Sequence, residues 1–206
     1  MKRVILLLAL LIHANLAFAE APLQLSVPNG RAPDDPNVNG IRISLFHGRN
    51  ESVRGLDLGL LSVSETGNLS GLGLVAGMGK VTGDMTGGAA ISLINIHNGR
   101  DAGLNAAFIN RLGSPEKAVN IGFVQIADGE TLLDIGGLNV SDRSTVQLGF
   151  INVTDEIKGF QFGFLNIASN EFLPFFPIFN FPKGPTSPST EPQPRPERRA
   201  PGQFDQ

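Results

Sequence analysis

The side chains that could carry out chemistry are few and scattered along this chain. There is no cysteine, which excludes disulfides, thiolate metal ligands and a lipid anchor on an N-terminal cysteine. Beyond residue 19 the only histidines are His47 and His97, and neither has clustered carboxylates at the spacing of metal ligands. The sequence also contains no Gly-x-Ser-x-Gly elbow that would present a nucleophilic serine. We therefore predict no catalytic residues and no metal site, and we do not expect an enzyme.

Two glycine-rich stretches match nucleotide-binding motifs in their letters only. Gly71–Ala76 (GLGLVA) has the spacing of the dinucleotide fingerprint, which needs a strand before it and a helix after it. Here Gly77 and Gly79 continue a strand repeat, so the helix is not expected. Gly79-Lys80 resembles the end of a phosphate-binding loop, but Val81 stands where Ser or Thr is required. We predict no cofactor.

The elements that would position any site come from one short phrase, which the chain repeats. Within Thr145–Ala168 the phrase VQLGFINV, residues 146–153, recurs as FQFGFLNI, residues 160–167. Ten copies can be followed as far as Phe181, spaced 13 to 17 residues apart, and such a regular period indicates a repeat architecture. The copies begin near Ile41, Leu56, Leu72, Ala89, Leu104, Val119, Leu133, Val146, Phe160 and Pro174.

Each copy has the alternation of a strand. Positions one, three and five are mostly apolar, as in Leu56, Leu58 and Leu60, position four is small, and position six is apolar again. Because neighbouring residues of a straight strand point to opposite faces, the adjacent apolar positions five and six need an explanation. Either a corner turns both toward one interior, or the strand is covered on both faces. Position seven is usually an amide: Asn95, Asn110, Gln125, Asn139, Asn152, Asn166 and Asn180, with His47, Ser62 and Met78 in the early copies.

These patterns predict an all-β fold, and two architectures fit them. The first is a repeat β-solenoid with about ten rungs, in which equivalent positions stack about 4.8 Å apart and the amides hydrogen-bond from rung to rung. Pro174 and Pro177 would then blunt the terminal edge, since proline cannot donate to a ladder. The alternative is an up-and-down antiparallel β-barrel, although Trp and Tyr, typical of membrane-barrel girdles, are absent. We favour the solenoid.

The ends of the chain indicate export and a polar tail. Met1–Ala19 has a positive start, an apolar run and a small-x-small cleavage site, the pattern of a secretory signal peptide. Glu20–Gly40 reads as an N-terminal strand and loop, residues 41–181 as the β-repeat domain, and Pro182–Gln206 as a disordered Pro-rich tail. Loss of Lys2 and Arg3 with the signal lowers the formal net charge from −3 to −5, which does not indicate nucleic-acid binding.

The repeated phrase, Gly-apolar-x-apolar-Gly-apolar-apolar-Asn-apolar, resembles that of the bacterial surface-repeat family first named from leptospiral proteins. The closing stretch LPFFPIFNF, residues 173–181, is similar to the terminal phrase of relatives in several Gram-negative groups. The resemblance covers about Leu23–Phe181 and implies an exported protein of the periplasm, outer membrane or cell surface, without catalytic residues. We expect a non-catalytic scaffold or binding surface with an envelope or surface partner of unknown identity. The alternative is a small outer-membrane β-barrel or pore, and outer-membrane association is compatible with either.

Overall fold

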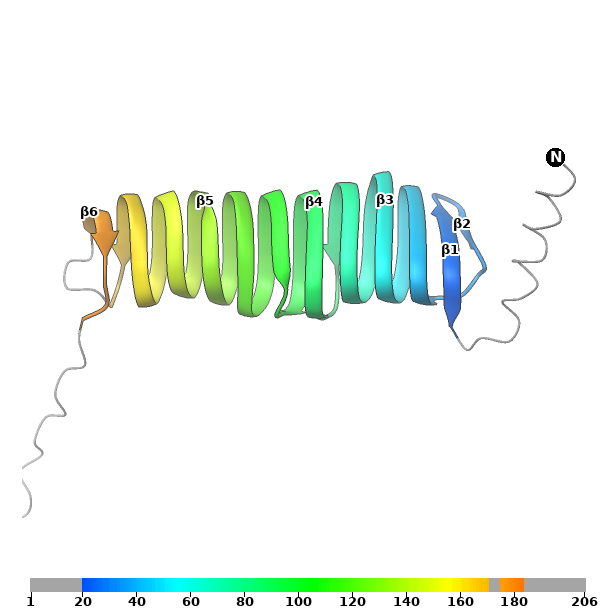
Figure 1. Ribbon diagram of the computed structural model, residues 1–206, viewed down its shortest axis with the longest axis horizontal. Helices are drawn as coiled ribbons and strands as arrows, with labels where there is room; N and C mark the ends of the chain where they lie inside the picture. The colour runs from blue at the N-terminus through cyan, green and yellow to red at the C-terminus, as the bar shows by residue number, and fades with distance from the viewer. Residues whose placement is uncertain (1–19, 171–174, 184–206) are drawn as a thin grey trace, which may run out of the picture.

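The computed structural model describes residues 20–170 and 175–183, which form an elongated rod made almost entirely of β-strand (Figure 1). The predicted signal peptide and most of the predicted tail lie outside these ranges. The six strands make one sheet in the order β2-β1-β3-β4-β5-β6. Their bounds are β1 (Ala21–Val27), β2 (Gly30–Ala32), β3 (Asn37–Val81), β4 (Met85–Asp101), β5 (Leu104–Ala168) and β6 (Phe175–Asn180).

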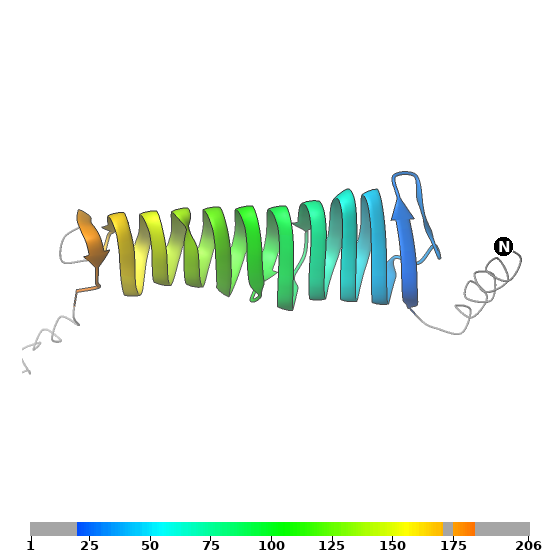
Figure 2. The same ribbon diagram turned by 45° about the horizontal axis from the view of Figure 1, so that its top comes forward.

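Strands β3 and β5 are far too long to be flat, and each winds through several turns of a coil. Figures 1 and 2 show this winding from two directions. Ala89 of β4 lies in parallel register between Leu72 of β3 and Leu104 of β5, so successive copies of the phrase stack on one another in one direction. The predicted β-solenoid is therefore confirmed, and the antiparallel barrel alternative is wrong.

A ladder of amides holds the turns in register. The Nδ2 of Asn95 donates to the Oδ1 of Asn110 at 2.9 Å, and Asn110 donates to the Oε1 of Gln125 at 2.7 Å. Further along, Asn139 donates to Asn152 at 2.7 Å and Asn152 to Asn166 at 2.8 Å. This confirms the predicted amide column, which works because every one of these copies runs the same way.

The glycine at position four makes room for the amide at position seven. A Cβ added to Gly149 would lie 2.4 Å from the Nδ2 of Asn139 and 2.8 Å from the Oδ1 of Asn152. Most of the amides also donate to a main-chain carbonyl of the next turn, as Asn152 does to Phe162 at 3.0 Å, whereas Asn95 donates to Ala90 O of its own turn. The recurring Gly-x-x-Asn spacing is thus explained by two needs: space over the glycine, and a donor for a carbonyl at the corner of the coil.

The predicted orientation of the apolar positions is wrong. In the copies of β5, alternation buries positions two and seven, turns position four toward the interior, and turns positions one, three and five outward. Phe108 at position five is 60 % exposed, whereas Ala107 before it is 8 % exposed. A corner does separate positions five and six, but both face the exterior: Leu60 and Leu61 are 54 % and 77 % exposed. The interior is largely polar, with small apolar clusters such as Leu112, Ala118 and Ala127.

The first copies depart from the common register at this corner. Phe46 and Leu61 have φ of 63° and 46°, a left-handed conformation that side chains other than glycine seldom adopt. A register shift between Val75 and Met78 then pairs Met78 with Ile94 and Gly79 with Asn95. Met78 therefore does not occupy the amide column, as the sequence repeat had suggested.

Both ends of the coil are closed by short antiparallel strands. At the N-terminus β1 runs parallel to β3, with Leu23 beside Ile41, and β2 folds back antiparallel on β1. At the C-terminus β6 pairs antiparallel with β5, with Asn180 beside Gln161. The tenth copy therefore reverses direction instead of adding an equivalent rung, and the prediction of about ten equivalent rungs is wrong at this end.

Candidate binding face

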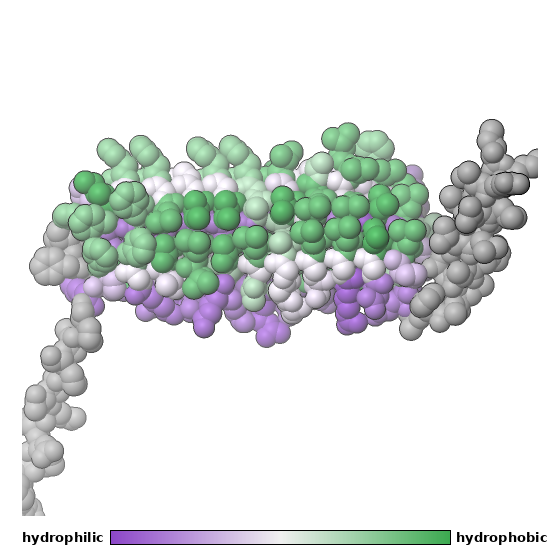
Figure 3. All heavy atoms as spheres, viewed as in Figure 1, coloured by the Kyte–Doolittle hydropathy of each residue, from purple (hydrophilic) through white to green (hydrophobic). Residues whose placement is uncertain are grey.

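The outward columns of the coil form a continuous apolar surface. We call positions one, three and five of the copies that begin between Ile41 and Phe160 the apolar face. It contains aliphatic residues, phenylalanine, alanine and glycine, without a polar or charged side chain. In Figure 3 these rows run along the rod as an unbroken hydrophobic band above a hydrophilic edge. Leu23, Leu25 and Val27 of β1 extend it, each at least 40 % exposed.

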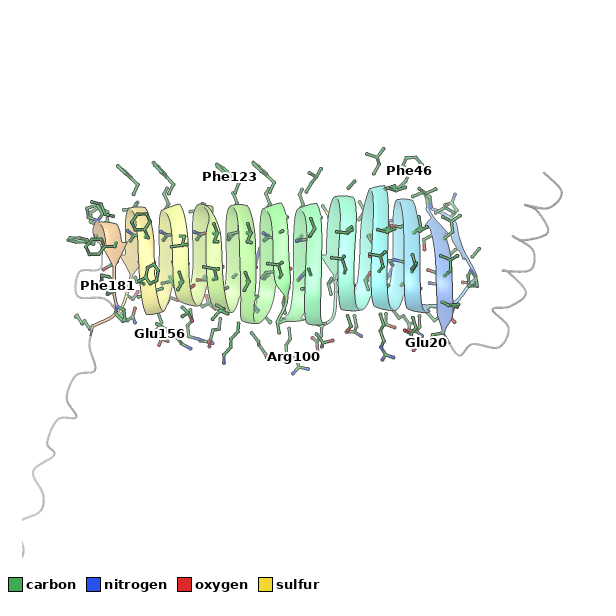
Figure 4. All side chains as sticks on the ribbon, viewed as in Figure 1. Glu20, Phe46, Arg100, Phe123, Glu156 and Phe181 are labelled. Carbon is green, nitrogen blue, oxygen red and sulfur yellow. The ribbon has the colours of Figure 1, made fainter. Side chains whose placement is uncertain are left out.

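Position five forms a ridge along one margin of the apolar face. In Figure 4 Phe123 projects from this margin, away from the rod. Phe108 and Phe123 stack with their ring centroids 5.2 Å apart, and Phe150 and Phe164 stack at 5.1 Å. The stacking repeats the spacing of the turns, so the rings support one another while one side of the column stays in solvent. The ridge consists of Leu45, Leu60, Ala76, Leu93, Phe108, Phe123, Gly137, Phe150 and Phe164.

A shallow depression interrupts the ridge where its residue is small. Ala76 lies between the longer side chains of Leu60 and Leu93, and the depression around it has a volume of about 530 Å³. Ile43, Leu58 and Leu74 and other apolar residues line it. Its size is within the range of small-ligand pockets, and its lining offers contacts to hydrocarbon.

A second outward surface begins beyond the ridge. Positions six and eight of the later copies are Ile, Val or Leu, as in Val124 and Ile126. The charged exceptions are Lys80, which pairs with Ile96 in register, and Arg111 at position eight. The ridge therefore stands between two apolar surfaces, so the rod has a convex apolar side.

The charged side chains gather on the opposite edge of the rod. Glu20, Arg100 and Glu156 mark this edge in Figure 4. Cross-turn ion pairs run along it, including Arg100–Asp84 at 3.0 Å and Lys158–Glu130 at 2.9 Å. Hydrogen bonds from the main chain and then the guanidinium of Arg100 lower the pKa of Asp84. The hydrogen bond from Lys158 lowers the pKa of Glu130.

A second interior column of polar residues, at position two, is missed by the sequence analysis. Asn105 donates to Asn120 at 3.3 Å, and Asn120 donates to Asp134 at 2.8 Å. Gln161 donates to Gln147 at 2.7 Å. Burial raises the pKa of the Asp134 carboxyl, against the lowering effect of its hydrogen-bond donors, Thr131 first among them. The polar residues that recur at position two of the repeat could have indicated this interior column.

The remaining candidates for chemistry are enclosed or isolated. His97 hydrogen-bonds through Nδ1 to Asp101, and both are at most 1 % exposed. Arg42 forms a buried ion pair with Asp57 at 2.6 Å. The enclosed cavity that Asp57 and His97 help to line holds only about 20 Å³, far below the size of a substrate pocket. His47 is half-buried near the N-terminal end.

The two stretches whose sequences match nucleotide-binding motifs, Gly71–Ala76 and Gly79-Lys80, are part of the coil. Residues 71–75 of β3 lie in parallel register with residues 88–92 of β4, and strand continues as far as Val81. The helix that a dinucleotide fingerprint requires is therefore replaced by strand. Lys80 lies 3.5 Å from Glu65, in an ion pair between neighbouring turns. In the ranges that the structure describes, no group of three or more His, Cys, Asp or Glu could hold a metal ion.

Comparison with known proteins adds no relative. The chain matches no protein-family model, no curated protein and no solved structure. The described part of the chain contains no helix that is long and apolar enough to cross a membrane.

Proposed function

We propose that this chain is an exported, non-catalytic protein of the cell envelope or cell surface that serves as a rigid scaffold or binding surface through its apolar face. The observation that carries the proposal is the extent of that face. Soluble monomers seldom expose contiguous apolar patches beyond a few hundred Å², and larger ones mark interaction sites. Here apolar residues continue from Leu23 in β1 to Phe164 near the end of β5.

The placement outside the cytoplasm is supported by the sequence. Met1–Ala19 has the three-part pattern of a secretory signal peptide. The repeated phrase also resembles that of a bacterial surface-repeat family. A chain without cysteine has to be held together by its own hydrogen bonds and packing outside the cell, and the buried amide ladders are suited to that need.

A binding role is favoured over a catalytic one by where the polar groups lie. The carboxylates and the histidine that are close enough to interact, such as His97 and Asp101, are enclosed by the coil. The exposed side chains of the apolar face, such as Phe108 and Phe150, offer contact, not proton transfer. The face therefore suits adhesion to another apolar surface.

The proposal is tested by producing the full chain in a Gram-negative host and fractionating the cells. We expect cleavage after Ala19, shown by the mass of the recovered protein, and recovery with the envelope fraction. A variant with Leu60→Ser, Phe108→Ser and Phe150→Ser, all exposed on the ridge, should move to the soluble periplasmic fraction.

The matched control carries the same number of serine substitutions on the charged edge, Glu51→Ser, Asp155→Ser and Glu156→Ser, which are also exposed. This control should remain with the envelope. Uncleaved protein in the cytoplasm, or a ridge variant that fractionates like the control, would overturn the proposed function.

A further inference from the structure

We infer that the partner of the apolar face is the hydrocarbon of a lipid bilayer, on which the rod lies with its ridge immersed and its charged edge in water. This inference rests on the proposed function and names what the face binds. It is carried by four features of the described residues: the uniformity of the face, the paired backbone beneath it, its convex shape, and the separation of charge from it.

The face is uniform along the rod, and it has no polar side chains that would fix a protein partner at one position along it. A protein–protein interface normally includes about ten hydrogen bonds within a polar rim. Positions one, three and five offer no side-chain donor or acceptor over the nine copies from Ile41 to Phe164. Three apolar positions recur at every turn without a polar group among them, so no hydrogen bond would oppose the sliding of a partner by one turn. A fluid hydrocarbon phase needs no register.

The backbone is also suited to hydrocarbon. Main-chain polar groups that enter a bilayer have to be hydrogen-bonded within the protein. The coil pairs each turn with the turns on either side, as β4 does with β3 and β5. The two terminal edges are covered by β2 and β6. The side of the rod therefore presents apolar side chains over a paired backbone.

The shape favours a medium that conforms to it. Two apolar surfaces meet at the ridge, where Leu60 and Leu61 point outward on either side of the corner. A flat partner would cover one surface and leave the other in water, and a second copy of this chain, itself convex on this side, would do the same. Acyl chains can surround both, and one can occupy the depression of about 530 Å³ beside Ala76.

The charges complete the match to an interface between lipid and water. The apolar face carries none, and the opposite edge carries ion pairs such as Arg100–Asp84 and Lys158–Glu130. Most basic groups on the described part of this edge are paired with acidic ones, as in these two ion pairs, so this edge offers little unpaired positive charge to anionic headgroups. Binding should therefore come from buried apolar area, with little dependence on salt or on lipid charge.

The first test is co-flotation of the protein that begins at Glu20, without the apolar run of the predicted signal peptide, with vesicles of pure phosphatidylcholine, and of phosphatidylcholine mixed with phosphatidylglycerol. We expect binding to both at low and high salt. Each of Phe108→Ser, Phe123→Ser and Phe150→Ser should weaken binding about tenfold, because each removes one large apolar group from the hydrocarbon. The exposed edge variant Glu156→Ser should bind like the parent, and circular dichroism should show that all four variants are folded.

The second test uses the absence of tryptophan and tyrosine from the chain. Phe123→Trp places a single fluorophore on the ridge, and Glu156→Trp places one on the charged edge. With phosphatidylcholine vesicles the ridge fluorophore should shift to the blue and be quenched by lipid brominated on its acyl chain. The edge fluorophore should do neither.

The alternative outcomes each overturn the inference. If the protein fails to float with either vesicle but sedimentation shows a dimer that the ridge substitutions dissociate, the face binds a second copy. A different outcome is that the ridge variants leave the envelope fraction of cells although the parent protein does not bind vesicles. In that case the face binds another macromolecule, and the proposed function is still supported. Binding only to the anionic vesicles at low salt would show a headgroup interaction instead.

Discussion

The amide ladder makes a strong prediction for Asn152, which is fully buried. Its side chain accepts from Asn139 at 2.7 Å and donates to Phe162 O at 3.0 Å and to Asn166 Oδ1 at 2.8 Å. Asn152→Ala removes all three bonds. Asn139 keeps its bond to Leu148 O at 3.1 Å, whereas the Phe162 carbonyl and the Asn166 amide oxygen lose a donor.

The size of the loss follows from these contacts. A buried polar group left without a partner costs about 1–3 kcal/mol. Two such groups, with the cavity left by the side chain, should lower the free energy of unfolding by about 3–5 kcal/mol. At a denaturant sensitivity of about 2 kcal/mol per molar, the midpoint in urea should fall by about 2 M.

The assay is urea unfolding followed by far-ultraviolet circular dichroism, since the chain has no tryptophan or tyrosine for fluorescence. The matched control is Asn98→Ala, at an exposed asparagine, which should change the free energy of unfolding by less than about 0.5 kcal/mol. If Asn152→Ala lowered the free energy of unfolding as little as this control does, the ladder would not stabilise the coil and the reasoning would be refuted.

Three other predictions concern the interior and the C-terminal edge. Because burial raises the pKa of Asp134, the folded state binds its proton more tightly than the unfolded state, and stability falls as pH rises from the ordinary carboxyl pKa through the raised one. Asp134→Asn should therefore raise the free energy of unfolding at neutral pH and lose that advantage near pH 4, as measured by urea unfolding at each pH. A difference between the variant and the parent that stays the same at both pH values would contradict this prediction. Asp57→Ala leaves the fully buried Arg42 without its carboxylate and should cost about 3–5 kcal/mol, whereas a loss below 1 kcal/mol would show that the pair is dispensable. Pro177→Val restores an N–H in β6 and should increase end-to-end association in sedimentation experiments. An unchanged sedimentation profile would refute the idea that Pro177 prevents other strands from pairing with this edge.

The direction and period of the coil could be predicted because the motif is itself directional. An asparagine three residues after a glycine is useful only if the neighbouring turn runs the same way, as the bond between Asn152 and Asn166 shows. The reversed β6 shares the letters of the phrase, so its letters alone could not reveal the antiparallel pairing. Pro177, which cannot donate to a ladder, was the sign that this copy differs.

The orientation of the coil could not be predicted from alternation alone. Alternation shows which residues share a face, as Leu56, Leu58 and Leu60 do, but not whether that face points in or out. A turn of about 14 residues has a perimeter of about 46 Å at 3.3 Å per residue, so its interior has room for only a few large side chains, such as Arg42 and Met85. Glycine at position four and amides at position seven meet that limit, and leucine and phenylalanine fit outside. Because alternation does not show which face points outward, the sequence did not predict that the apolar face is exposed.

The central claim is that this solenoid encloses its polar residues and exposes its apolar ones. The most direct measurement compares two neighbouring residues in a chain that has no natural cysteine. Ala107→Cys and Phe108→Cys are each treated with a thiol reagent under native, detergent-free conditions. We predict that Cys at position 108 reacts at least about a hundredfold faster, because position 107 becomes accessible only through local opening of the coil. Equal rates, or faster reaction at position 107, would contradict the claim.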